Sequence, residues 1–180
     1  MDASEFKKRL ENCVPGIEDL AKVGLLSDEV DELRRSFFII KRKERLERIG
    51  LPGQLGELFK NYDPSNVEIG MLKFDLEPHK KNSSWVIGQV EADLLVVDTV
   101  SGEVCVEDLT SVQKHILWRC AKDGQSFLAA MLLAACFLGR CLHDERLASD
   151  KLQRNSCVDE CVIAAGGELY RPFYQMLIGL

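Results

Sequence analysis

Residues 93 to 109, DLLVVDTVSGEVCVEDL, contain the feature that most constrains the fold: four consecutive apolar residues, Leu94 to Val97. Neighbouring side chains of a strand point to opposite faces, so a strand with this run needs cover on both sides. We therefore predict a central strand over 93–99. Gly102 can supply the positive φ of a short hairpin loop, and Val104 and Val106 then alternate with Cys105 and Glu107 on the returning strand.

More extended segments surround this hairpin. β-branched and aromatic residues are frequent in VEIGMLKFDLE, SWVIGQVEADLLVVDTV, EVCVEDL and HILWRCA, so residues 67 to 120 predict an antiparallel meander of four to six strands. A helix is expected to follow over 127–143, with Ser126 as its cap. Its first three turns are apolar all round, which predicts that it is buried against the sheet, with Met131 and Leu132 inside.

Helical patterns flank the sheet. Residues 1 to 48 are predicted to be N-terminal helices, which Asp2 or Ser4 can cap at the start and Pro15-Gly16 interrupts. An apolar stripe of Val30, Leu33, Phe37 and Phe38 is expected in the core. The basic run KRKERLER, residues 41 to 48, also carries two glutamates, so we interpret it as a solvated helix face.

The rest of the chain divides into two parts. Residues 49 to 120 are predicted to hold a turn, a short helix with Leu55, Leu58 and Phe59 inward, and the meander; Pro52 excludes helix at Leu51. Residues 121 to 180 are predicted to be C-terminal helices. One, around 149–165, ends at Gly166-Gly167, and the last has Pro172 in its first turn and Phe173, Met176 and Leu177 facing inward.

These elements predict one α+β domain over residues 1–180, with an antiparallel sheet of four to six strands packed against helices and an N-terminal helical extension. A chain of 180 residues, 46% of them hydrophobic, is long enough to bury its own core. The charge-free run from Ser126 to Gly139 is shorter than the roughly 18 residues that favour a membrane span, so no membrane contact is expected. The start of the chain shows no signal peptide, which predicts a cytoplasmic protein.

The charge balance limits the class of partner. The chain has 23 Lys and Arg residues and 29 Asp and Glu residues, which gives a net charge of -6. Nucleic-acid phosphates repel an acidic protein unless its Lys and Arg residues cluster, so we expect no direct nucleic-acid binding. A neutral or basic protein partner is favoured, and the sequence does not determine the oligomeric state.

No residue set predicts catalysis or a cofactor. The seven cysteines are scattered and lack a CxxC pair, so they are expected to be unbridged and metal-free in a reducing cytosol. Cys120 and His115 are separated by an odd number of residues, which places them on opposite faces of a strand and argues against a cysteine nucleophile. The paired carboxylates lie at strand ends and turns, and no glycine-rich phosphate loop is present. We expect a protein that is not an enzyme.

The order of short motifs resembles a known family. An IGLP turn (49–52) precedes a Leu-rich helix; a D-x-x-x-G-E-V hairpin (98–104) lies in the meander; SF introduces the long helix; and GGELYRPFYQML closes the chain. This arrangement resembles the SUKH superfamily, the proteins similar to yeast Smi1/Knr4, over residues 30–180. The resemblance implies an α+β fold with a curved antiparallel sheet, and an immunity protein of a bacterial polymorphic toxin system used in contact-dependent competition.

Immunity members of this superfamily bind a cognate toxin, commonly a nuclease or nucleotide-modifying domain. A regulatory or scaffold interaction module of the Smi1/Knr4 type is the alternative. Because the apolar hairpin residues are needed in the core, the polar ones are left for a partner. We predict that a basic toxin surface meets six carboxylates, here named the sheet acids, with Trp85 as an apolar anchor: Glu91, Asp93, Asp98, Glu103, Glu107 and Asp108. Solvated turn acids and a packed tryptophan are the competing interpretation.

Overall fold

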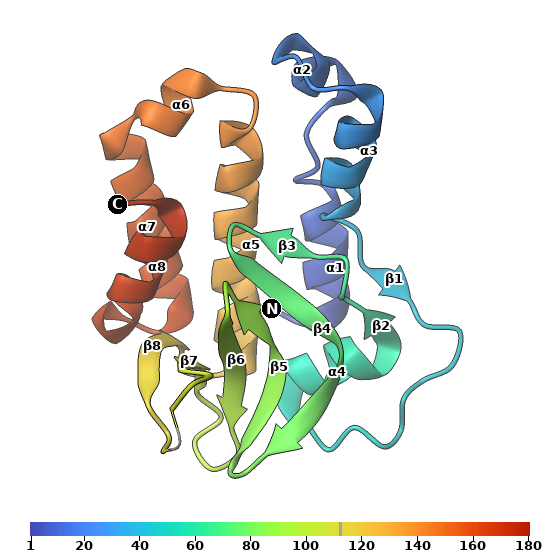
Figure 1. The fold of residues 1–180 in the computed structure, drawn as a ribbon, viewed down its shortest axis with the longest axis vertical. Coiled ribbons are helices and arrows are strands. Elements are labelled where there is room, and N and C mark those ends of the chain that lie inside the picture. Colours follow the sequence, from blue (N-terminus) through green and yellow to red (C-terminus); the bar gives the residue numbers. More distant parts are fainter. Residues whose placement is uncertain (112) are drawn as a thin grey trace.

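Six antiparallel strands, hydrogen-bonded in chain order, form the main sheet in a computed structural model that describes residues 1–111 and 113–180 (Figure 1). The strands β3 to β8 have these bounds: Glu68–Ile69, Leu72–Lys81, Ser84–Val90, Asp93–Asp98, Val104–Glu107 and Ile116–Ala121. β6 lies between β5 and β7, so the prediction of a central strand is confirmed. Gly102 has a φ of 76° in the β6–β7 loop. The α+β class is therefore established.

Helices come before and after this sheet. The first group is α1 (Ala3–Glu11), α2 (Ile17–Lys22), α3 (Ser27–Arg35) and α4 (Gly53–Asn61). The second is α5 (Gly124–Cys141), α6 (Glu145–Ser149), α7 (Lys151–Ala165), the 3₁₀ turn η1 (Glu168–Tyr170) and α8 (Arg171–Ile178). Figure 1 shows α5 running between α1 and α3 on one side and α7 and α8 on the other. α5 thus joins the two helical groups and also contacts β3 and β8.

α5 is the central helix of the core. Met131 and Leu132 are buried, as predicted. The expected cap, Ser126, is wrong by one turn: the Asp123 carboxylate accepts the Ser126 N–H at 2.7 Å, so the helix begins at Gly124. With 18 residues, α5 is long and apolar enough to cross a membrane by length and composition alone, yet 56% of it is buried within the fold. Its packing therefore explains its apolar character.

The N-terminal helices end earlier than predicted. After α3 the chain forms β1 (Ile40–Lys41), which pairs with β2 (Tyr62–Asp63), and then a loop, so the basic run is not a helix. The Arg42 guanidinium donates to the backbone carbonyls of Phe59 and Tyr62 at 3.1 and 2.9 Å, which fixes this non-helical path. Because α3 ends at Arg35 and a turn follows, Phe37 and Phe38 do not continue the helical stripe: Phe37 is buried, while Phe38 is 39% exposed, contrary to the prediction.

The C-terminal helices cover the last strand. α7 ends at Gly166, whose φ of 118° is the left-handed conformation expected of a terminating glycine. Phe173 and Leu177 of α8 are buried as predicted, and Met176 is half-buried. The buried Tyr174 hydroxyl donates to the Cys120 carbonyl at 2.8 Å, which attaches α8 to β8.

A disulfide joins the end of α1 to α5. Cys13, just after α1, is bonded to Cys136 in α5, with their Cα atoms 4.9 Å apart. The prediction that all seven thiols are unbridged is therefore wrong for this pair. The packing of α1 against α5 brings together two cysteines that lie 123 positions apart in sequence. No local sequence pattern indicates that these two cysteines pair. The other five cysteines are unbridged.

Candidate partner-binding surfaces

Asp98, the first of the sheet acids on the hairpin, is occupied by contacts within the fold. Its Oδ1 atom accepts the backbone N–H groups of Val100 and Ser101 at 3.0 and 2.9 Å. Its Oδ2 atom lies 2.7 Å from the Lys114 ammonium. The hydrogen bond from Lys114, followed by that from the Ser101 amide, holds the pKa of Asp98 well below its ordinary value of 3.8. Asp98 therefore closes the β6–β7 loop.

Glu107, which was expected to face a partner, is buried, at 9% exposed. It accepts a hydrogen bond from the Ser84 hydroxyl at 3.2 Å and lies 3.4 Å from the Lys114 ammonium. Burial alone would lower the pKa of Lys114, but Asp98 and Glu107 together raise it. The curled sheet thus turns one predicted surface carboxylate into an interior ion-pair partner.

Two more sheet acids also have partners inside the protein. Glu103 forms an ion pair with Arg119, and this contact raises the pKa of the guanidinium. The Asp108 carboxylate accepts hydrogen bonds from the hydroxyl groups of Ser111 and Thr110 at 2.6 and 2.7 Å, which lower the pKa of Asp108. These acids hold turns and strand pairs together.

The sheet acids do not all lie on the same side of the sheet as Trp85. Glu91 is exposed in the β5–β6 turn with a φ of 53°, and Asp93 accepts the Leu109 N–H at 3.1 Å. On β5, Ser84 lies opposite Asp98 in register, so the next residue, Trp85, points to the other side of the sheet. Trp85 is half-buried there, against the main core. The structure therefore does not assemble the sheet acids and Trp85 into one surface.

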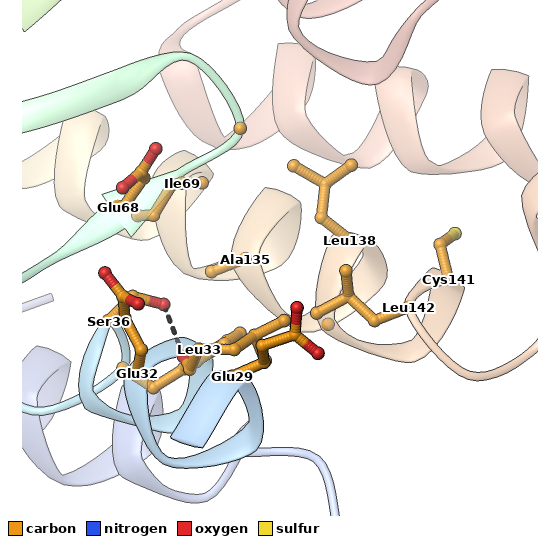
Figure 2. Close-up of a pocket in the computed structure, with 13 residues that line it drawn as sticks. Glu29, Glu32, Leu33, Ser36, Glu68, Ile69, Ala135, Leu138, Cys141 and Leu142 are labelled. Carbon is orange, nitrogen blue, oxygen red and sulfur yellow. Dashed lines mark hydrogen bonds between the residues drawn. The ribbon is translucent and has the colours of Figure 1, made fainter. Parts of the chain in front are cut away.

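A groove of about 570 Å³ lies elsewhere, between α3, β3 and α5 (Figure 2). Its floor and walls are apolar, with the Leu33, Ile69, Ala135 and Leu138 side chains facing the same space. Leu142, just past α5, is 42% exposed at its end. The volume falls within the range of about 300 to 1,000 Å³ that is usual for ligand pockets.

Three exposed carboxylates, here named the groove acids, border this groove: Glu29, Glu32 and Glu68. Glu29 accepts the Leu26 N–H at 2.8 Å and caps α3. Glu68 lies 2.9 Å from the Lys73 ammonium. Glu32 has no hydrogen-bond or ion-pair partner within residues 1–111 and 113–180. No Lys or Arg is among the residues that line the groove in the described part of the chain.

Local sequence explains this geometry. Glu29 and Glu32 are three residues apart on α3 and flank the groove beside Leu33. On the facing side, Leu138 of α5 and Leu142 just after it are four residues apart, at the end where α5 extends beyond the sheet. The β3–β4 turn packs closely against the Leu177 side chain at Gly70. The φ of Gly70 is 59°, and an added Cβ would lie 3.1 Å from Leu177. Of these groove features, the sequence shows only Glu29 and Glu32 at i and i+3. Acids near the start of a helix are explained equally well by their interaction with the helix dipole.

The described residues hold little that suits catalysis. They contain no group of three or more His, Cys, Asp or Glu side chains that could hold a metal ion. Cys120 is fully buried, and burial raises the pKa of its thiol well above the ordinary value, which keeps it protonated. His115 is exposed beside Asp108, 3.6 Å from its carboxylate. This arrangement does not activate Cys120 as a nucleophile.

Comparisons of the chain with protein-family models, with curated proteins and with solved structures give no significant match.

Proposed function

We propose that the protein is an immunity protein of the SUKH type that neutralises a cognate bacterial toxin in the cytoplasm by stoichiometric binding. The toxin is a nuclease or nucleotide-modifying domain. The motif resemblance supports this proposal, and the fold is compatible with it: helices precede a curled antiparallel sheet, the D-x-x-x-G-E-V residues form a hairpin, and a long helix follows. Membership of the superfamily is part of the same proposal.

The observation that carries the proposal is the groove. The groove has an apolar floor and three carboxylates at its edge, two of which have no cationic partner among the described residues. This combination suits the capture of a basic protein surface, and complementary charge speeds association of such partners. The buried, protonated Cys120 and the internally paired sheet acids offer no matching set of groups for chemistry. Binding without turnover is therefore the function that the described residues favour.

A regulatory or scaffold module of the Smi1/Knr4 type is the second candidate, because the same kind of groove serves any basic partner. Gene order separates the two. An immunity gene lies directly beside a large gene with a variable C-terminal toxin domain, whereas a scaffold gene has no such neighbour.

Co-expression with the neighbouring toxin domain tests the proposal directly. Cells that make the toxin domain should survive only when this chain is also made, and the purified pair should elute as a one-to-one complex. If the cells die although the chain is folded and abundant, or if the two proteins elute separately, the immunity proposal fails.

A further inference from the structure

We infer that the groove between α3, β3 and α5 receives a basic amphipathic helix of the toxin, an inference that rests on the proposed immunity function. The toxin helix inserts apolar side chains against Leu33, Ala135 and Leu138, while its Lys and Arg side chains lie beside the groove acids. This site differs from the sheet acids and Trp85, which the sequence suggested.

The carboxylates at the groove favour a partner with a positive charge. Lys73 forms an ion pair with Glu68, whereas the Glu29 side chain is bonded to a backbone N–H group that brings no countercharge. Glu32 is exposed and unpaired within the described residues. A cation at this rim meets two carboxylates without a countercharge, those of Glu29 and Glu32, near an apolar surface where water screens their attraction less than in bulk solvent.

The elements that border the groove favour a bound helix over a bound strand. An added strand needs a free sheet edge, and β3, which borders the groove, is the edge strand of the main sheet. However, β3 has only two residues, and the Glu68 N–H already donates to the Ser36 carbonyl at 3.2 Å. The groove instead lies between two helices, a shape that accepts the apolar face of a third helix with anchors at i, i+4 and i+7.

Other surfaces support the inference less well. The cavity beside Trp85 is lined by Arg45 and Arg48 as well as Glu47 and Glu77, so its charge favours no single sign of partner. The cavity near Lys114 is about 60 Å³, and its two acids, Glu107 and Asp108, are bonded within the fold. The α3–β3–α5 groove combines an apolar floor with a rim whose charged lining residues are all carboxylates.

A peptide probe tests the groove without the toxin. The probe is a short helical peptide with leucines at i, i+4 and i+7 and with lysines and arginines beside them. Titrated into the ¹⁵N-labelled protein, it should shift the amide signals of residues 29–36, 68–71 and 135–142. Matched peptides with glutamate in place of the bases, or with serine in place of the leucines, should leave these signals unshifted. Shifts confined to the sheet hairpin would overturn the inference.

Charge reversal tests the rim. The double variant Glu32→Lys with Glu68→Lys should bind the peptide and the cognate toxin domain at least about tenfold more weakly, because like charges now meet. The control, Glu44→Lys with Glu160→Lys, alters two exposed acids on elements that do not line the groove and makes the same change in net charge. It should bind within about twofold of the wild type, since physiological salt screens charges beyond about 8 Å. Equal weakening in both variants would overturn the inference.

The toxin experiment separates the two proposals. If wild-type protein protects cells and binds the toxin, but the groove variant does so equally well, the groove assignment is wrong and the immunity function stands. If wild-type protein neither protects nor binds, the immunity function is wrong. If light scattering instead shows a dimer that the groove variant abolishes, a second copy of this chain occupies the groove, and the inference is wrong.

Discussion

The two acidic regions of the protein differ in how their carboxylates are used. On the sheet, Asp98 and Glu107 share Lys114, and Glu103 pairs with Arg119. At the groove, Glu32 has no partner within the described residues, and an apolar floor lies beside it. A carboxylate whose charge is already balanced inside the fold attracts a further cation less strongly than an unpaired one. The availability of an acid therefore depends on its neighbours rather than on the net charge of the chain.

The largest expected difference between the regions is in stability. Glu107→Ala should lower the free energy of unfolding by about 2 kcal/mol, because the buried Ser84 hydroxyl and Lys114 both lose an acceptor. Denaturant titration measures the change. The matched control is Glu32→Ala at the groove, which should stay within about 0.5 kcal/mol of the wild type. Equal losses in the two variants would remove the distinction drawn between the surfaces.

Asp98→Asn should have a smaller effect that depends on pH. Asparagine keeps an oxygen for the loop N–H groups but loses the charge that faces Lys114, so we expect a loss of about 1 kcal/mol at neutral pH, limited by solvent screening. The folded-state pKa of Asp98 is depressed, so its charge stabilises the fold above 3.8 and ceases to do so as the pH falls further.

Unfolding measured from pH 7 down to about pH 2 checks this prediction, since the wild type and Asp98→Asn should converge in acid. Asp31→Asn, on an exposed helix position, serves as the control for a general loss of one negative charge. A gap between wild type and Asp98→Asn that widens in acid would contradict the proposed ion pair.

The smallest expected change in stability is that of Glu32→Lys. The side chain is exposed and has no partner within the described residues, so the free energy of unfolding should change by less than about 0.5 kcal/mol. Thermal unfolding followed by circular dichroism measures it. A marked loss of stability would mean that Glu32 supports the fold like the sheet acids, and the contrast between the two regions would disappear.

Much of the fold was predictable because it depends on local patterns. Four consecutive apolar residues required an interior strand, Gly102 marked the hairpin loop, and the apolar helix around Met131 had to be buried. The errors occurred where distant contacts override a local pattern. Arg42 binds carbonyls that follow it by 17 and 20 residues, and it lies in a run whose composition also suits a helix.

The candidate site was less predictable than the fold. The sequence identifies Glu107 as a polar position on a strand, but its burial depends on the curl of the sheet and on Lys114. The groove combines α3, β3 and α5, and no spacing rule relates Glu32 to Ala135 across about a hundred residues. A sequence pattern can show which face of a helix is polar, but it does not show what lies opposite that face.

The disulfide between Cys13 and Cys136 makes a closed covalent ring that contains the whole main sheet. A protease that cuts the exposed loop at residues 43–48 would therefore leave two fragments joined in one molecule. The smaller fragment carries α3 with Glu29 and Glu32, and the larger carries β3 and α5. Nicked chain would run as a single band until a thiol is added, and both walls of the groove would stay tethered to each other after the backbone between them is broken.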